Sequence, residues 1–202
     1  MSEWFGYLLD DYRLQFAPGG LVLDLGCGPC EHMEDLRGQA AAVVGIDRSL
    51  TALQACDRRG LRVQARAEHL PFRSAVFDGI LCKVVLPYTR EDEAVREIGR
   101  LLKPGGRCYL QCQGAGYFLR YLLCAPTWRM RVYGMRSLLN TWLLVGIGQR
   151  LPAWLGDSMY QSRPRLSRLF SVSDLVVVDD TESPRFLGFP VFTYQILEKR
   201  RS

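Results

Sequence analysis

The sequence lacks several features that would assign it at once to a familiar class of protein. Its 202 residues include only two histidines, no internal repeat and no low-complexity tract. A membrane-spanning helix needs about 20 apolar residues, and the most apolar stretch, residues 138–148, is well short of that length. The content of 48% hydrophobic and 23% charged residues is ordinary for a globular chain. We therefore expect one domain spanning residues 1–202, without a transmembrane segment.

A secretory signal is also missing, because Met1 is followed by Ser2 and Glu3 rather than by a basic and then an apolar region. The seven cysteines are therefore expected to stay reduced, as thiols do in the cytoplasm. Cys27 and Cys30 form a C-x-x-C pair, but no second pair or histidine cluster completes a zinc site. We expect a cytoplasmic protein without a metal site, whose cysteines are small core or loop residues.

The sequence does contain a regular alternation of short apolar runs with helical stretches. The runs are typical of strands buried on both faces, and they lie at residues 21–23, 41–47, 61–67, 77–84 and 106–113. Helical patterns separate them near residues 30–38, 50–58 and 90–102. This alternation predicts an α/β fold with an open, doubly wound, mostly parallel sheet. Two further runs, 174–180 and 189–199, predict an antiparallel hairpin at the edge of what is then a seven-stranded sheet.

Two segments lie outside this alternation. Residues 1–18 carry apolar groups at helical spacing and end at a Pro-Gly-Gly stop signal, which predicts an N-terminal helical cap. Residues 114–170, after the fifth predicted strand, are rich in aromatic residues and are predicted to form a helical insertion. This insertion contains eight arginines and one acid, a net charge of +7, whereas the rest of the chain carries −2. The basic character of the chain therefore belongs to one segment.

The residues that most clearly indicate chemistry follow the first two predicted strands. Asp24 precedes a turn in which Gly26 and Gly28 would let a ligand approach the backbone closely. Asp47 ends the second strand 21 residues after Gly26, the distance at which an acid can accept hydrogen bonds from ribose hydroxyls. A dinucleotide site would have a further glycine where this chain has Glu31, whose charge would repel a pyrophosphate. We therefore expect a nucleoside ligand without phosphates rather than NAD.

These motifs resemble those of class I S-adenosylmethionine-dependent methyltransferases, in particular the broad group acting on small molecules. LVLDLGCGPC (21–30) resembles the first motif of that family, and VVGIDRS (43–49) resembles its ribose-binding strand end. ARAEHLPFRSAVFDGIL (65–81) is similar to its third and fourth strand region, and REIGRLLKPGGRCYL (96–110) to its later helix, turn and fifth strand. The resemblance implies the Rossmann-like methyltransferase fold, S-adenosylmethionine as the cofactor and methyl transfer as the reaction.

The resemblance also implies a set of cofactor-binding residues. They are Asp24, Gly26, Cys27, Gly28, Asp47, Arg48, Ala67, Glu68, Cys82 and Lys83. In the family the first loop holds the methionine part, the second strand end holds the ribose, the segment after the third strand borders the adenine, and the fourth strand end meets the amino acid group. Cys30 replaces a frequent third glycine, and Lys83 stands where a smaller polar residue is more usual. Glu68 could equally be a solvated loop acid.

A catalytic residue is harder to assign from the sequence. Transfer from a sulfonium is an in-line displacement, which depends mainly on alignment of the acceptor and exclusion of water. A base helps a hydroxyl acceptor more than a neutral amine, and the acceptor atom, O, N or C, stays open. The candidates are Tyr88 after the fourth strand, Tyr117 after the fifth, and His69, which could equally be a packing or loop residue.

The arginine-rich insertion lies where the resembled enzymes commonly recognise their substrates. Tyr117, Arg120 and Arg129 are the candidate substrate-binding residues, since arginine suits an acidic group on a small, partly hydrophobic molecule. RNA is an alternative partner, although no recognised RNA-binding motif is present. Anionic lipid beneath the amphipathic stretch 117–134 is another, and so is a merely solvated arginine face. An RNA methyltransferase and a non-catalytic cofactor-binding subunit therefore stay open beside the small-molecule enzyme, and no oligomeric state is indicated.

Overall fold

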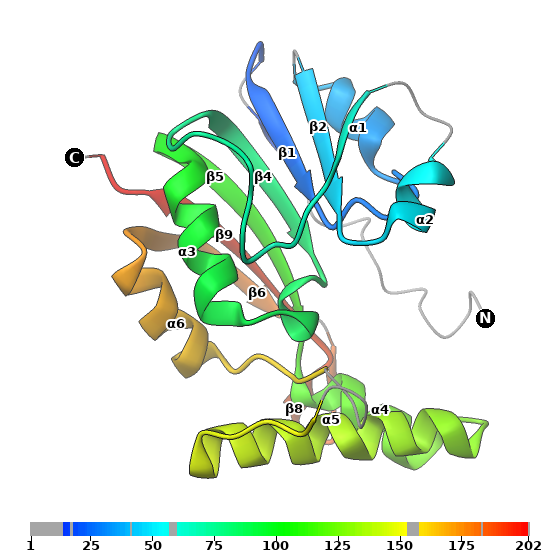
Figure 1. The fold of residues 1–202 in the computed structure, drawn as a ribbon. Coiled ribbons are helices and arrows are strands. Elements are labelled where there is room, and N and C mark those ends of the chain that lie inside the picture. The colour runs from blue at the N-terminus through cyan, green and yellow to red at the C-terminus, as the bar shows by residue number, and fades with distance from the viewer. Residues whose placement is uncertain are drawn as a thin grey trace.

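One mixed sheet organises the part of the chain that the computed structural model describes, namely residues 14–16, 18–40, 42–56, 60–152, 158–182 and 184–201. Seven strands of this part lie in the order β3-β2-β1-β4-β5-β9-β6 (Figure 1). Their bounds are β1 Leu21–Leu25, β2 Ala42–Asp47, β3 Leu61–Gln64, β4 Phe77–Lys83, β5 Leu102–Gln113, β6 Leu175–Glu182 and β9 Phe192–Lys199. Strands β1 to β5 pair in parallel, whereas β9 runs antiparallel to both β5 and β6. The predicted doubly wound, mostly parallel sheet is confirmed.

Helices cover both faces of this sheet, as the apolar character of its strands requires. They are α1 Met33–Arg37, α2 Leu50–Gln54, α3 Glu91–Leu101, α4 Ala115–Cys124, α5 Trp128–Ile147 and α6 Arg163–Val172, with a 3-10 helix, η2, at Leu86–Tyr88. Val22 of β1 packs in a cluster with Met33 of α1. The next residue, Leu23, packs in a separate cluster with Ile98 of α3 and Phe170 of α6. Alternate residues of one strand thus serve two cores, which explains the unbroken apolar runs.

The predicted C-terminal hairpin is confirmed, with one difference at its turn. Strand β6 forms the edge of the sheet, and β9 lies between β6 and β5. The link between them contains a second, smaller hairpin formed by β7 (Arg185–Phe186) and β8 (Phe189–Pro190). Residues 189–190 therefore pair within the link rather than with the sheet, so β9 begins at Phe192 and not at residue 189.

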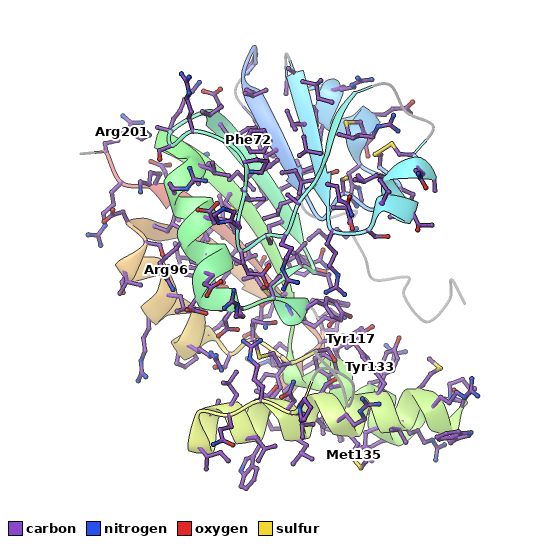
Figure 2. All side chains as sticks on the ribbon, viewed as in Figure 1. Phe72, Arg96, Tyr117, Tyr133, Met135 and Arg201 are labelled. Carbon is purple, nitrogen blue, oxygen red and sulfur yellow. A yellow bond between two sulfur atoms is a disulfide. The ribbon has the colours of Figure 1, made fainter. Side chains whose placement is uncertain are left out.

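The predicted insertion at residues 114–170 has two parts in the structure. Helices α4 and α5 pack against each other beyond the carboxyl end of β5, and Tyr117 and Tyr133 lie between them and the sheet (Figure 2). Helix α6 instead returns to the sheet, where Leu166 packs in the core beside α3. The helical prediction is thus confirmed for the described residues, but α6 serves the sheet core. No helix in the described ranges is long and apolar enough to cross a membrane.

The predicted N-terminal cap at residues 1–18 falls largely outside the described residues. Of this segment, Phe16 is buried and packs edge-on against Tyr109 of β5, with ring centroids 4.9 Å apart. The main-chain N–H of Gln15 donates to the Tyr109 hydroxyl at 3.0 Å, and that hydroxyl donates to the Gln15 carbonyl at 2.7 Å. This short stretch therefore lies on the face of β5 that belongs to the α1 core.

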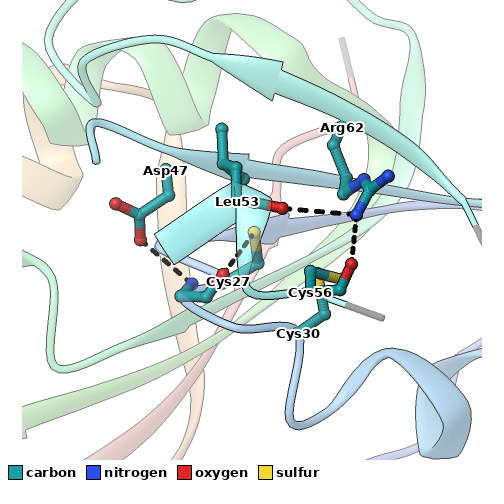
Figure 3. The surroundings of a disulfide bond; sticks show 7 residues. Cys27, Cys30, Asp47, Leu53, Cys56 and Arg62 are labelled. Carbon is teal, nitrogen blue, oxygen red and sulfur yellow. Dashed lines mark hydrogen bonds between the residues drawn. A yellow bond between two sulfur atoms is a disulfide. The ribbon is translucent and has the colours of Figure 1, made fainter. Parts of the chain in front are cut away.

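The expectation that all seven cysteines stay reduced is wrong for one pair. Cys30 and Cys56 form a disulfide, with their Cα atoms 5.4 Å apart (Figure 3). Cys30 lies in the loop after β1 and Cys56 follows α2, so the parallel pairing of β1 with β2 brings them together. Their spacing of 26 residues could not indicate the bond, because it depends on that pairing. The remaining cysteines are free thiols, namely Cys27, Cys82, Cys108, Cys112 and Cys124.

Candidate functional site

A cavity of about 160 Å³ lies at the carboxyl ends of the adjacent parallel strands β3, β2, β1 and β4. Carboxyl ends of parallel strands meet at one edge of a sheet, and ligand crevices of open α/β folds form there. The lining residues come from each strand end and the segment after it: Leu25, Gly26, Ile46, Asp47, Arg48, Ala65, Arg66, Ala67, Glu68, Lys83, Val84, Val85, Tyr88 and Thr89. The fold thus gathers four separate sequence segments around one space.

Many of the residues predicted to bind the cofactor line this cavity. They are Gly26, Asp47, Arg48, Ala67, Glu68 and Lys83. The others, Asp24, Cys27, Gly28 and Cys82, are close neighbours of lining residues in the sequence, and the side chain of Cys82 is fully buried in the core. The sequence reasoning missed the apolar part of the wall, for example Leu25, Ile46 and Val85. Apolar wall residues form no motif in a sequence. These residues could have been found only from their position next to predicted site residues.

The glycine-rich loop after β1 is clamped to the end of β2. The N–H groups of Gly26 and Cys27 both donate to the carbonyl of Ile46, at 2.7 and 2.9 Å. The N–H of Gly28 donates to Oδ2 of Asp47 at 3.0 Å. Gly26 has a φ of +78°, and a Cβ there would overlap the side chain of Val85. These three N–H groups are therefore used within the protein and hold the loop against the end of β2.

Asp24 is the most unusual ionisable group of the site. It is 2% exposed, and its Oδ2 accepts no hydrogen bond from any residue that the structure describes. Burial raises the pKa of Asp24 to about 7, against the opposing charge of Lys83, and the nearby carboxylate of Asp47 adds to the rise. A buried carboxyl oxygen without a partner is costly. An unpartnered carboxyl oxygen of this kind is expected where a cationic group of a ligand supplies the missing hydrogen-bond donor.

Lys83, at the end of β4, has a partner that the sequence reasoning did not assign to the site. Its Nζ lies 2.9 Å from Nε2 of His32, in the loop that precedes α1. Burial lowers the pKa of His32 below its ordinary value, and the charge of Lys83 adds to the decrease. Burial also lowers the pKa of Lys83, against the charges of Glu31 and Asp24. The lowered pKa of His32 favours a neutral imidazole, which can accept a hydrogen bond from the Lys83 ammonium.

Glu68 combines a place in the cavity wall with a structural role. Its Oε1 accepts a hydrogen bond from the main-chain N–H of Arg90, the residue before α3, at 3.0 Å, and another from Arg66 at 3.4 Å. Burial alone would raise the pKa of Glu68, but these hydrogen bonds outweigh it, so its pKa lies below the ordinary value. Glu68 is therefore a charged wall residue that also fixes the start of α3.

Comparisons with known proteins find methyltransferases. Residues 23–110 match the family model described as a methyltransferase domain. A ubiquinone biosynthesis O-methyltransferase of Xylella fastidiosa is 28% identical over 198 residues, which cover 86% of this chain and 80% of that protein. A demethylmenaquinone methyltransferase of Corynebacterium urealyticum is 36% identical over 97 residues, which cover 47% of this chain and 42% of that protein. The match to an uncharacterised methyltransferase of Bacillus subtilis likewise spans only 42% of its length.

Solved structures show the same fold. An S-adenosylmethionine-dependent methyltransferase from Mesorhizobium loti superimposes with a TM-score of 0.68 at 18% identity, covering 98% of both chains. The structure of one from Listeria monocytogenes gives 0.69 at 16% identity, covering 99% of this chain and 97% of that one. Together these matches support a class I S-adenosylmethionine-dependent methyltransferase. The cavity of this methyltransferase therefore lies where its fold binds nucleoside ligands.

S-adenosylmethionine is the cofactor of this family, and the cavity of this methyltransferase fits it in three respects. The unpartnered, buried oxygen of Asp24 suits an ammonium group. Asp47, at the end of β2, presents a carboxylate to the cavity. A Cβ placed on Gly28 would meet nothing within 4 Å, so there is open space beside the loop. The residues present are thus compatible with an adenosyl sulfonium.

The candidates for catalysis and substrate binding are distributed unevenly around the methyltransferase cavity. Tyr88 lines it, and its hydroxyl lies 2.9 Å from that of Tyr133 on α5. Tyr117 lies away from the lining, stacked on Tyr121, and burial raises its pKa above the ordinary value, so it stays protonated. His69 is exposed and does not line the cavity. Tyr88 is therefore the base candidate that the structure brings to the cavity.

The two predicted substrate-binding arginines also lie away from the cavity lining. Arg120 lies on α4 and is partly buried. Arg129 is exposed near the start of α5, where its guanidinium lies 5.8 Å from the ring centroid of Trp128. Arg129 therefore directs its charge toward the outer surface of the protein.

Proposed function

We propose that the protein transfers the methyl group of S-adenosylmethionine to a small, partly hydrophobic acceptor. The observation that carries this proposal is the pairing of two carboxyl groups at one cavity of a methyltransferase domain. Asp47 lines the cavity, and Asp24 precedes the lining residues Leu25 and Gly26, with a buried oxygen that forms no hydrogen bond to any described residue. One carboxylate suits ribose hydroxyls and the other suits an ammonium group.

The remaining predicted residues receive roles from their places around the cavity. Lys83 carries the positive charge at the end of β4, which suits the carboxylate of the methionine part. Ala67 and Glu68 border the adenine, and Arg48 lies beside the ribose. Cys27 and Gly28 contribute through the main chain, because the thiol of Cys27 is buried and burial raises its pKa to about 12.

The acceptor side of the cavity favours an aromatic molecule. Val84 and Val85 follow β4 in the cavity wall, and Tyr88 adds a hydroxyl to this apolar surface. Two relatives of this chain are named as a ubiquinone biosynthesis O-methyltransferase and a demethylmenaquinone methyltransferase. We infer a quinol-like or phenolic acceptor whose oxygen or neighbouring ring carbon receives the methyl group, with Tyr88 as the residue that hydrogen-bonds and orients it.

Methyl transfer from a sulfonium does not require the protein to form a covalent bond with either reactant. S-adenosylmethionine, when bound, supplies a methyl group that is already activated for displacement. The side chains of Val84, Val85 and Tyr88 exclude water and hold the acceptor in line. Tyr88 and Tyr133 form a hydroxyl pair that can orient a phenolic acceptor by hydrogen bonding, and the proton that the acceptor loses on methylation goes to solvent.

Calorimetric titration with S-adenosylhomocysteine tests the cofactor assignment. Wild-type protein is expected to bind it and not to bind NAD. Asp47→Ala should weaken binding about tenfold, because the charge-assisted hydrogen bonds to the ribose are lost. Asp179→Ala, which removes an exposed acid from the edge strand β6, is the matched control and should bind as wild type does. Unchanged affinity in Asp47→Ala would refute the placement of the ribose.

Turnover tests the acceptor class. Release of S-adenosylhomocysteine from S-adenosylmethionine should rise when a catechol or a short-chain demethylmenaquinol is added. Tyr88→Phe should slow this turnover while leaving the affinity for S-adenosylhomocysteine unchanged, since Tyr88 is assigned to the acceptor. Tight cofactor binding without turnover on either compound would contradict the aromatic acceptor.

A further inference from the structure

Helix α5 turns its small polar residues toward the protein and its large apolar residues toward solvent. Its buried residues are Gly134, Ser137, Asn140 and Thr141. Its exposed large side chains are Trp128 at 70%, Met135 at 49%, Leu139 at 43%, Trp142 at 68%, Val145 at 67% and Ile147 at 63%. A surface helix ordinarily has the opposite arrangement, with the apolar side against the core. This helix is therefore inverted relative to the usual pattern.

Hydrogen bonds fix the helix in this inverted orientation. The Ser137 and Ser158 hydroxyls lie 2.6 Å apart, and Nδ2 of Asn140 donates to the Ser158 carbonyl at 3.1 Å. The main-chain N–H of Leu151 donates to Oδ1 of Asn140 at 2.9 Å, and that of Tyr160 donates to Oγ1 of Thr141 at 3.0 Å. Rotating α5 to bury its apolar side would break these bonds and leave buried polar groups unpaired.

Four of the exposed side chains, Trp128, Met135, Leu139 and Trp142, form one stripe, the α5 stripe. Their spacings of seven, four and three residues place them on one side of a helix. The stripe is about 21 Å long at roughly 1.5 Å per residue. Figure 2 shows Met135 on the side of α5 away from the sheet. A solvent-facing apolar stripe of this kind normally contacts a partner.

The charge beside the stripe selects the kind of partner. Residues 114–152 contain no aspartate or glutamate, and Arg129 and Arg131 are exposed near the start of α5. A second copy of this chain, packed about a two-fold axis, would place like charges against each other without an acid to neutralise them. An anionic surface would instead neutralise the charges of Arg129 and Arg131. Tryptophan with arginine along a helix is typical of the membrane–water interface.

We propose that the α5 stripe lies on an anionic phospholipid surface, with Trp128 and Trp142 in the interface and Arg129 and Arg131 at the headgroup phosphates. The opposite side of α5 carries Tyr133, whose hydroxyl contacts that of Tyr88 in the cavity wall. The helix would thus hold the cavity on the membrane side of the molecule. This surface is separate from the cofactor residues, so the proposal does not depend on the proposed function.

Sedimentation of the full chain with vesicles tests this proposal. Wild-type protein should bind vesicles of equal parts phosphatidylglycerol and phosphatidylcholine, and bind pure phosphatidylcholine vesicles less. Leu139→Ser with Trp142→Ser should lower the partition coefficient about tenfold or more, since two large side chains no longer insert. Arg129→Gln with Arg131→Gln should lower it about tenfold and reduce the preference for phosphatidylglycerol. Val172→Ser, which changes a side chain that is 72% exposed on α6, is the matched control and should bind as wild type does.

Three results would overturn the proposal: no binding to the anionic vesicles, equal loss of binding in Val172→Ser, or a concentration-dependent dimer in ultracentrifugation that Trp142→Ser abolishes. The last result would identify a second copy of the chain as the occupant of the stripe. Each variant should keep the wild-type affinity for S-adenosylhomocysteine, which separates a failure here from misfolding and from failure of the proposed function.

Discussion

At the scale of single residues, Asp24 shows how a site can be built at the expense of stability. A carboxyl that is 2% exposed and lacks a partner for Oδ2 among the described residues resists ionisation, and its pKa rises to about 7. The folded protein therefore keeps this proton at pH values where the unfolded chain has released it. For this group alone, the free energy of unfolding falls as the pH rises from about 4 toward 7.

Replacement of Asp24 by asparagine should remove this dependence. The free energy of unfolding of wild type relative to Asp24→Asn is expected to fall by about 2–3 kcal/mol between pH 5 and pH 8, because each pKa unit corresponds to about 1.4 kcal/mol. Urea denaturation of both proteins at the two pH values measures it. The same variant should bind S-adenosylhomocysteine more weakly at pH 8, since the charge that meets the ammonium is gone. A constant stability difference across the pH range would argue against a buried, ionisable Asp24.

At the scale of elements, the strand ends decide which cavity-lining residues the sequence could indicate. Asp47 could be indicated because a strand that is buried on both faces ends in an acid at the ligand edge, whereas Lys83 was indicated only by the family resemblance. Ala65 and Thr89 were missed because they occupy turns whose direction depends on several strands at once. The pairing of Cys30 with Cys56 was missed for the same reason, since it depends on how two βα units lie beside each other.

That disulfide ties the glycine-rich loop to the end of α2, and it should stabilise the fold measurably. Replacing both Cys30 and Cys56 by serine should lower the free energy of unfolding by about 3 kcal/mol, because a closed loop of this size restricts the unfolded chain. Urea denaturation without reductant measures the change. Cys124→Ser, which removes an exposed free thiol, is the control and should have little effect.

Thiol titration gives an independent check on the same bond. The denatured but unreduced protein should show the five free thiols of Cys27, Cys82, Cys108, Cys112 and Cys124, and the reduced protein should show all seven. Seven reactive thiols before reduction would exclude the bond.

At the scale of the whole molecule, the sequence predicted the sheet far better than the placement of the helices beyond it. Unbroken apolar runs and their alternation with helices determine a doubly wound sheet, because few other arrangements bury both faces. The orientation of α5 is not determined in that way. The usual amphipathic arrangement would place the apolar side of α5 against the core. The buried side instead carries Ser137, Asn140 and Thr141, because segment 158–160 supplies their hydrogen-bond partners. Local periodicity does not contain that information.

Cofactor binding should also be visible as a property of the whole molecule. The cavity joins the ends of β3, β2, β1 and β4, so a ligand there links four segments that separate on unfolding. S-adenosylhomocysteine at about 100 times its Kd should add about 2.7 kcal/mol to the free energy of unfolding, which for a chain of this size raises Tm by roughly 5–10 °C. Differential scanning calorimetry measures the shift, and NAD at the same concentration should leave Tm unchanged. Asp47→Ala should show a smaller shift at that ligand concentration, because binding is weaker while the global fold remains. A shift of equal size in wild type and Asp47→Ala would mean that the stabilisation arises at a different site.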